Sequence, residues 1–192
     1  MSKYYSGTVA QLESIVAKAV SQKRFEHILR VRDYAIVLSK KYNVNSDQAE
    51  VAALVHDYAK DRSDSDFLKA IDAKHLDPDL KNWNNAIWHG VVGAEMIHDE
   101  LGITDSEILD AVRQHTTGSD NMSLLSQILF MADYLEMGRH FPGVEEARAL
   151  TDNNLQSGVK YQITHTLAYL ASQSLPIHPL SLTTYNYWVK HA

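Results

Sequence analysis

Apolar residues recur at helical spacing along most of this chain, whereas alternation of apolar and polar residues with a period of two is hard to find. Between residues 23 and 42, for instance, Ile28, Val31, Ala35 and Leu38 fall on one stripe of a helix. Only 8 Gly and 4 Pro interrupt the 192 residues, and three of the prolines lie after residue 140. This pattern predicts an all-α protein.

The chain contains no internal repeat, low-complexity segment or interdomain linker, so we expect one domain over residues 1–192. Its motifs lie within about 20–150, and C-terminal helices are expected within about 144–190. The expected helices cover about 8–21, 23–42, 46 onward, 86–101, 104–115 and 122–137, with short helices within 64–85. One or two more would end near Ala171, before two prolines and a short aromatic tail.

Two of these helices carry a recognisable start signal. Asn45 and Gln48 could form a capping pair for the helix that begins near Ser46. Thr104 and Glu107 have the spacing of a capping box for the helix that ends near residue 115.

Composition excludes several functional classes. The chain has no cysteine, which excludes disulfides, thiolate catalysis and cysteine-ligated metal sites. A net charge of −6 argues against a general nucleic-acid or anionic-membrane binder, although a few local cations can still hold a small polyanion. Because no signal peptide is visible and no apolar run approaches the roughly 18 residues of a membrane helix, we expect a cytosolic protein with no membrane partner.

The strongest local signal is the adjacent pair His56-Asp57 in LVHDYAK, whose side chains would point in two directions from a helix. Other polar residues that can ligate a metal lie on apolar helix faces: His27, His89, His115 and Asp133. A carboxylate on such a face is costly unless it is paired or bound to a metal. Several such residues in one small chain predict a shared, buried polar site.

Each of these histidines alone would more often be a satisfied core or surface residue, but the ordered set favours a metal site. The remaining histidines join no coherent pattern: His75, His98, His140, His165, His178 and His191. Imidazole and carboxylate ligands without sulfur suit Fe, Mn, Zn, Co or Ni. Two such metals about 3.5–4 Å apart could clamp the oxygens of a displacement at phosphorus and supply hydroxide at neutral pH.

Four charged residues are candidates for contacts around that site. Lys60 lies one turn after His56 and could neutralise phosphate charge, and Asp61 could orient water or a proton. Arg24 lies one turn before His27, and Arg139 follows the expected helix that carries Asp133 and could grasp phosphate with two hydrogen bonds. Each could equally be a solvated helix charge, and Arg139 a cation favoured at a helix C-terminus.

The order His27, His56-Asp57, Asp133 resembles the HD phosphohydrolase superfamily. Six segments are similar to its YqeK-type members, the symmetrical diadenosine tetraphosphate hydrolases: KRFEHILRV, ALVHDYAK, WHGVVGAEM, RQHTTG, LFMADYLE and GRHFPGVEEAR. The resemblance spans roughly residues 20–150. It implies an HD-domain helical bundle with a metal centre, commonly of iron and here expected to hold two metal ions. It also implies attack by a metal-activated water and cleavage into two nucleoside diphosphates.

By position, the resemblance makes His27, His56, Asp57 and Asp133 the core metal ligands. His89 and His115 would complete a second metal position or contact phosphate, and Thr116, Thr117 and Arg139 are placed to touch substrate. A homodimer is also suggested by the resemblance. The alternatives are another HD phosphohydrolase, acting on nucleotide monophosphates or guanosine alarmones, and a nucleotide-binding module without activity.

Overall fold

The computed structural model describes residues 3–192, and within that range all regular structure is helical. The helices are α1 (Val9–Ala19), α2 (Gln22–Lys41), α3 (Ser46–Val55), α4 (Asp64–Ala73), the 3-10 helix η1 (Pro78–Asn82), α5 (Asn85–Val91), α6 (Gly93–Leu101), α7 (Ser106–Gln114), α8 (Leu124–Leu135), α9 (Val144–Asn153), α10 (Leu155–Ser172) and α11 (Pro179–His191). The prediction of an all-α fold is confirmed. None of the helices among residues 3–192 is long and apolar enough to cross a membrane.

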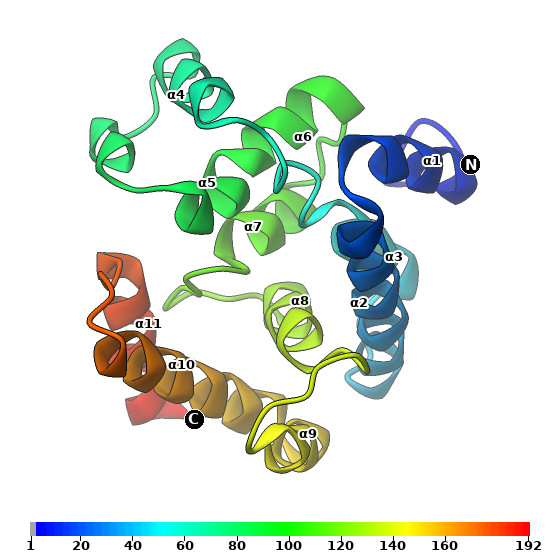
Figure 1. The fold of residues 1–192 in the computed structure, drawn as a ribbon. Helices are drawn as coiled ribbons and strands as arrows, with labels where there is room; N and C mark the ends of the chain where they lie inside the picture. Colours follow the sequence, from blue (N-terminus) through cyan, green and yellow to red (C-terminus); the bar gives the residue numbers. More distant parts are fainter. Residues whose placement is uncertain (1–2) are drawn as a thin grey trace.

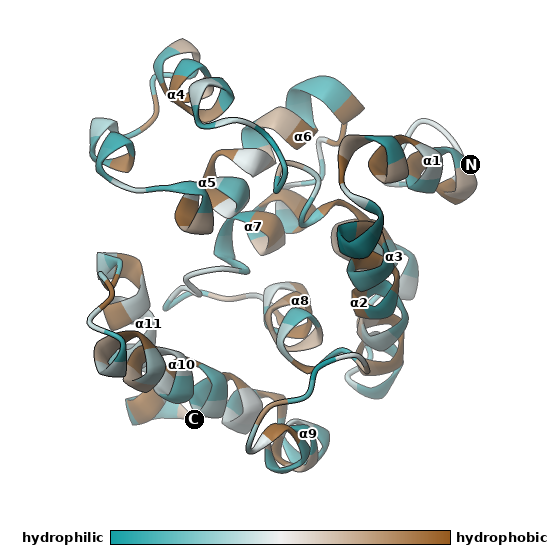
Figure 2. Cartoon of the chain, viewed as in Figure 1, coloured by the Kyte–Doolittle hydropathy of each residue, from teal (hydrophilic) through white to brown (hydrophobic). Residues whose placement is uncertain are grey.

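Helix α8 forms the centre of the molecule. Residues 125–132 of this helix are all buried, including the polar Ser126 and Gln127, as expected of a mainly apolar helix that other helices surround. It contacts α2 and α3 on one side, α7 on another, and α9 and α10 on a third. Figure 1 shows α8 near the middle with these helices around it, and Figure 2 shows that the surrounding helices carry both hydrophilic and hydrophobic residues.

Two expected capping pairs are wrong in detail. The Asn45 side chain does cap α3 by accepting from Asp47 N and Gln48 N, but Gln48 does not bond back to it. Instead, Gln48 Nε2 donates to Asp105 Oδ1 and Glu107 Oε2, because α3 and α7 pack together. Helix α7 is capped by Asp105, not by the preceding threonine, through a bond from Ile108 N. Aspartate is among the strongest N-caps, and its carboxylate satisfies the first turn one residue later than expected.

The single helix expected over residues 86–101 is two helices, α5 and α6, which meet at Val92. Gly93 lies at this junction, where an added Cβ would come 3.2 Å from Ala59 Cβ. The glycine therefore lets α6 approach the turn that follows His56-Asp57.

The expected aromatic tail is also helical, because Pro179 occupies the first turn of α11, where its missing N–H costs nothing. Helix α11 is held against the loop between α7 and α8 by two hydrogen bonds. Thr184 Oγ1 donates to Thr117 O at 2.9 Å, and Trp188 Nε1 donates to Ser119 O at 2.8 Å.

Candidate metal centre

The fold brings the six candidate ligands to one buried place from five separate segments. They are His27 on α2, His56 and Asp57 in the turn after α3, His89 on α5, His115 at the end of α7, and Asp133 on α8. Potential ligand atoms group in three sets within 4.8 Å: His27 with His56 and Asp57; His56 with His115 and Asp133; and Asp57 with His89 and His115. Sharing of His56, Asp57 and His115 between sets makes this one continuous cluster.

Asp57 lies at the middle of this cluster because the backbone changes from α-helical to 3-10-type hydrogen bonds immediately after α3. Bonds from Tyr58 N to Val55 O and from Lys60 N to Asp57 O form successive three-residue turns in place of a further α-helical turn. Asp57 Oδ1 is then 3.4 Å from His89 Nε2 and 3.8 Å from His115 Nε2. Its other oxygen, Oδ2, faces His56 Nε2 at 3.6 Å and His27 Nε2 at 3.8 Å.

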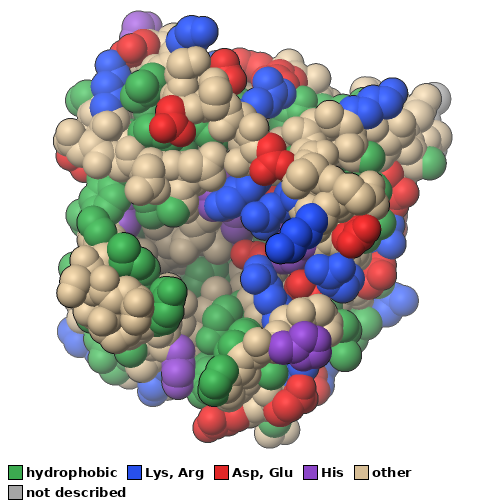
Figure 3. Space-filling model, in the orientation of Figure 1, with side chains coloured by type: hydrophobic (Ala, Val, Ile, Leu, Met, Phe, Trp, Pro, Cys, Tyr) green, Lys and Arg blue, Asp and Glu red, His purple; other side chains and the backbone are tan. Residues whose placement is uncertain are grey.

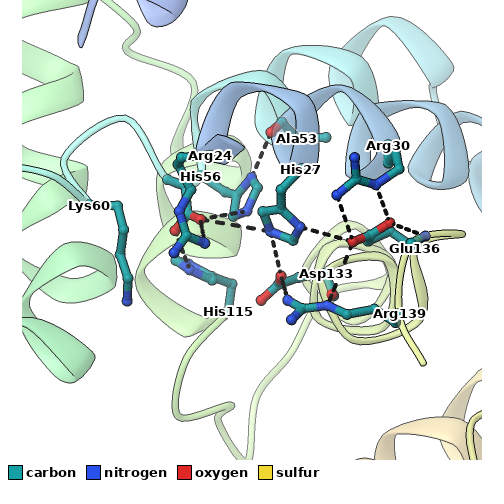
Figure 4. Close-up of polar contacts among 12 residues, drawn as sticks. Arg24, His27, Arg30, Ala53, His56, Lys60, His115, Asp133, Glu136 and Arg139 are labelled. Atoms are coloured by element: carbon teal, nitrogen blue, oxygen red, sulfur yellow. Dashed lines mark hydrogen bonds and ion pairs between the residues drawn. The ribbon is translucent and has the colours of Figure 1, made fainter. Parts of the chain in front are cut away.

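All four imidazoles are oriented in the same way, with Nδ1 on an acceptor outside the cluster. Nδ1 of His56, His89 and His115 donates to a main-chain carbonyl, at 2.7, 2.6 and 2.7 Å respectively. His27 Nδ1 instead faces Glu136 Oε1 at 3.2 Å (Figure 4). Each bond fixes the proton on Nδ1 and leaves the Nε2 lone pair directed into the cluster, as a metal ligand requires.

Burial keeps two of these imidazoles, those of His56 and His89, neutral. It lowers the pKa of His56 to about 4 and that of His89 to about 3, in each case against the attraction of Asp57. Burial alone would raise the pKa of Asp57, but the surrounding imidazoles, His56 foremost, lower it well below its usual range. Near pH 7, His56 and His89 are therefore neutral nitrogen ligands and Asp57 is an ionised oxygen ligand.

The cluster has unsatisfied atoms where a cation would fit. Nε2 of His27 and Nε2 of His56 are buried and make no hydrogen bond. His27 Nε2 is also 3.0 Å from Asp133 Oδ1, so nitrogen and carboxylate oxygen converge (Figure 4). Orphaned buried nitrogens beside two carboxylates fit a divalent metal, because the ion would satisfy both sets of atoms.

Glu136 is a functional candidate that the sequence analysis missed. Its side chain is 2% exposed and accepts from His27 Nδ1, from Arg30 Nε at 2.7 Å and from Gly138 N. Burial raises the pKa of Glu136, but the hydrogen bonds from Arg30, Gly138 and His27 together outweigh this and lower it overall. The available signal was an acidic residue one turn after Asp133, at the end of an otherwise buried helix.

Beside the cluster is a cavity of about 420 Å³ whose lining includes one lysine and three arginines. The lining residues are Ser21, Lys23, Arg24, His27, Arg30, Asp61, Glu136, Gly138 and Arg139. Figure 3 shows the corresponding group of Lys and Arg side chains along one side of a hollow in the molecular surface. A cationic cavity next to a metal-type ligand set suits a phosphate chain.

Of the residues predicted to contact substrate, Arg24 and Arg139 line this cavity, whereas Lys60 does not. Arg24 Nη1 contacts Asp57 Oδ2 at 2.8 Å, and Arg139 Nη2 contacts Asp133 Oδ1 at 2.9 Å. Lys60 Nζ lies 3.2 Å from His89 Nδ1, and burial lowers the pKa of Lys60.

Asp61 is exposed at the rim, where its Oδ2 accepts from Ser21 N at 2.7 Å. Thr116 Oγ1 is buried and has no hydrogen-bond partner, so it remains available to a ligand. Thr117 is 1% exposed, and its hydroxyl donates to Gly118 O. Thr117 thus holds the loop between α7 and α8, and its contact with substrate stays a prediction.

A helical fold with this histidine and aspartate cluster defines an HD-type domain, and the HD domain model matches residues 24–138. The chain belongs to the HD domain family, whose members are metal-dependent phosphohydrolases. All six candidate ligands lie within the matched residues.

Among its relatives, the chain is 36% identical to the symmetrical bis(5'-nucleosyl)-tetraphosphatase of Bacillus subtilis, over 91% of this chain and 94% of that protein. It is 37% identical to the protein of the same name from Halalkalibacterium halodurans, over 90% of this chain and 92% of that protein. A crystal structure from Clostridium acetobutylicum superimposes with a TM-score of 0.91 at 29% identity, covering 97% of this chain and 99% of that one. That protein is described as a predicted HD superfamily hydrolase involved in NAD metabolism.

Proposed function

We propose that this protein hydrolyses diadenosine tetraphosphate symmetrically to two molecules of ADP. The observation that carries the proposal is the position of the buried histidine and aspartate cluster beside a cationic cavity. The names of the relatives that match along almost the whole chain support this choice of substrate. Water would add one oxygen to a phosphorus at the centre of the tetraphosphate, and the bridging P–O bond to the other half would break.

The metal ligands in this proposal are His27, His56, Asp57, His89, His115 and Asp133. We infer two metal positions that share Asp57, because its two oxygens face different imidazoles. Iron is the metal we favour, since the nitrogen and oxygen donors suit it. When bound, the metals would supply Lewis-acid stabilisation of phosphate oxygens and lower the pKa of a water molecule.

The other residues act on the charge and position of the phosphates. Arg24 and Arg139 would hold non-bridging phosphate oxygens by charge-assisted hydrogen bonds from the cavity wall. Lys60 would donate from Nζ to a phosphate oxygen. His89 Nδ1 does not compete as an acceptor for Lys60, because it carries a proton that it donates to Asn85 O. Asp61 at the rim could accept a proton from an attacking water that lies near Ser21 and Arg24.

A panel of substrates on metal-reconstituted protein tests the function. Diadenosine tetraphosphate should yield ADP alone, as resolved by chromatography, and at a higher kcat/KM than AMP or a guanosine alarmone. ATP plus AMP as products would show asymmetric cleavage. Preference for AMP or an alarmone would favour a different HD phosphohydrolase, and binding without turnover under any metal would favour a binding module.

The two-metal arrangement has its own test. His89→Ala and His115→Ala each remove one Nε2 from the side of Asp57 that faces α5 and α7. Each variant should bind fewer metal ions per protein than the wild type and still retain one, as measured by elemental analysis after reconstitution. Full metal content in both variants would assign these histidines to phosphate contact instead.

A further inference from the structure

The C-terminal helices build a second cavity that contains no acidic or basic side chain except one histidine. Its volume is about 390 Å³, within the roughly 300–1,000 Å³ of small-molecule sites. The lining residues are Asn82, Trp83, Asn84, Ala86, Ile87, Thr116, Thr166, Leu170, Leu175, Pro176, His178 and Ser181. We call this the apolar cavity.

The side chains of the apolar cavity suit an uncharged, planar heterocycle. The rings of Trp83 and His178 meet edge to face, with centroids 4.5 Å apart, and both line the cavity. Ile87, Leu170 and Leu175 add aliphatic surface, while amide and hydroxyl groups supply hydrogen-bonding capacity. A phosphate chain would gain no countercharge here, in contrast to the cationic cavity.

The apolar cavity begins next to the metal centre. Thr116 follows the candidate ligand His115 directly, and its buried hydroxyl lacks a partner. Asn84, another lining residue, adjoins Asn85, whose Nδ2 donates to Lys60 O at 3.0 Å. Figure 3 shows hydrophobic side chains on the side of the hollow opposite the Lys and Arg group. A ligand with phosphates at the metal centre could therefore extend into this cavity.

Half of the wall lies outside the residues that match the HD domain, which end at 138. Thr166 and Leu170 come from α10, and Leu175, Pro176 and His178 from the segment that leads into α11. In Figure 1, α10 and α11 lie on the side of α8 away from α2 and α3. The shared core thus carries the metal ligands, and the C-terminal helices of this chain add a neutral wall beside them.

We propose that the apolar cavity binds one nucleoside of the substrate, and that α10 and the segment before α11 determine which nucleosides are accepted. This inference rests on the proposed function for the identity of the phosphate chain. Leu170 is the specificity-determining position we choose, because it is half-buried, faces this cavity and lies far in sequence from every candidate metal ligand.

The test compares Leu170→Trp with Leu182→Trp in the metal-loaded protein. Leu182 is 45% exposed on α11 and lines none of the cavities described here, so the same change there controls for added bulk. Calorimetric titration with ADP and with inorganic pyrophosphate separates the nucleoside from the phosphates. Leu170→Trp should weaken ADP binding at least tenfold and leave pyrophosphate binding within twofold, and Leu182→Trp should change neither.

Two results would overturn the proposal: wild-type protein that binds ADP no more tightly than pyrophosphate, or Leu170→Trp with unchanged ADP affinity. If Leu170→Trp does not fold, as judged by its melting curve, Trp83→Ala decides by the same pair of titrations. Hydrolysis assays keep the two proposals apart. Selective loss of ADP binding in a protein that never cleaves the dinucleotide supports the cavity and refutes the function. Cleavage of the dinucleotide with an unaltered KM in Leu170→Trp supports the function and refutes the cavity as the nucleoside site.

Discussion

The histidines of the metal centre differ in what holds their Nδ1 atoms. Three are held by main-chain carbonyls of their own helices or turns, which no side-chain substitution can remove. His27 alone depends on a side chain, Glu136, which is 109 residues away in sequence. The orientation of His27 is therefore the one that a single substitution outside the ligand set can disturb.

Glu136→Gln should weaken metal binding without abolishing it. Glutamine keeps the shape of the side chain but loses the charge that orients His27 and pairs with Arg30. Outer partners of ligating histidines typically contribute about 10–100-fold in metal affinity. Activity measured across a metal titration should need correspondingly more metal and approach the wild-type kcat at saturation. Glu146→Gln, an exposed change on α9, is the control; equal metal dependence in both variants would remove Glu136 from this role.

Arg139 tests phosphate clamping at the cavity wall. A charge-assisted hydrogen bond contributes roughly 1.5–3 kcal/mol, so Arg139→Ala should lower kcat/KM by about ten- to a hundredfold. Arg139→Lys should recover only part of the loss, because an ammonium cannot make the planar two-pronged contact. Metal content should remain near that of the wild type. Arg113→Ala removes an arginine that pairs with Glu95 and Asp110 instead, and should leave kcat/KM unchanged.

If Arg139→Ala retains kcat/KM within twofold, the side chain is only a cation at the end of α8. Loss of metal together with rate would instead show that its main task is to hold Asp133, which it contacts at 2.9 Å.

The candidate ligands could be proposed from sequence because each polar residue interrupts an apolar helix face, and that pattern is local. Glu136 was missed because its one local signal, an acidic residue one turn after Asp133, is equally typical of a solvated helix end. Its burial depends on Arg30 and His27 from α2, and such a partnership exists only after α2 and α8 have packed.

Among the elements, α11 depends on a short loop for its position. That loop, residues 115–119, runs directly from the candidate ligand His115 to the acceptors of the Thr184 and Trp188 bonds. Gly118 has φ +67°, and an added Cβ would come within 2.4 Å of Thr184 Cγ2. Glycine is required here both by the backbone conformation and by the close approach of α11.

Gly118→Ala should therefore destabilise the protein more than backbone strain alone predicts. Strain at positive φ costs roughly 1–2 kcal/mol, and overpacking adds about 1–3 kcal/mol. Gly102 is a matched control, because its φ is +65° and nothing lies within 4 Å of an added Cβ. At about 2–4 °C per kcal/mol for a domain of this size, the overpacking at Gly118→Ala should lower Tm by about 2–12 °C more than Gly102→Ala does. Equal melting temperatures for the two variants would mean that α11 moves away from the added methyl group at no cost in stability.

The extent of the long helices could be read from the sequence, whereas their ends and breaks often could not. Helix α2 agrees with the expected range to within a residue at each end, since its apolar stripe is continuous. The junction at Val92 was missed, because it follows from contact between Gly93 and Ala59. The helical C-terminus was missed as well, since Pro179 was taken as a break and not as the first residue of α11.

For the molecule as a whole, the metal centre is where the two sides of the helical core meet. Its ligands come from α2 and the turn after α3 on one side, from α5 and α7 on another, and from α8 between them. Four buried imidazoles, the buried carboxylate of Asp57 and the half-buried carboxylate of Asp133 meet there, and without a cation they repel or remain unsatisfied. Metal binding should therefore stabilise the packing of the core as well as supply chemistry.

Removal of the metal should lower the melting temperature together with activity. A ligand that binds only the folded state adds about 2.7 kcal/mol at a free concentration 100 times its Kd. At about 2–4 °C per kcal/mol, chelation should lower Tm on the order of 5–10 °C, and re-addition of metal should restore it. Asp57→Asn is the control, because it removes the carboxylate that faces all four imidazoles, and chelation should then shift Tm little. A wild-type Tm that stays constant after elemental analysis has verified metal loss would contradict the structural role, and activity lost at the same time would confine the metal to the chemistry.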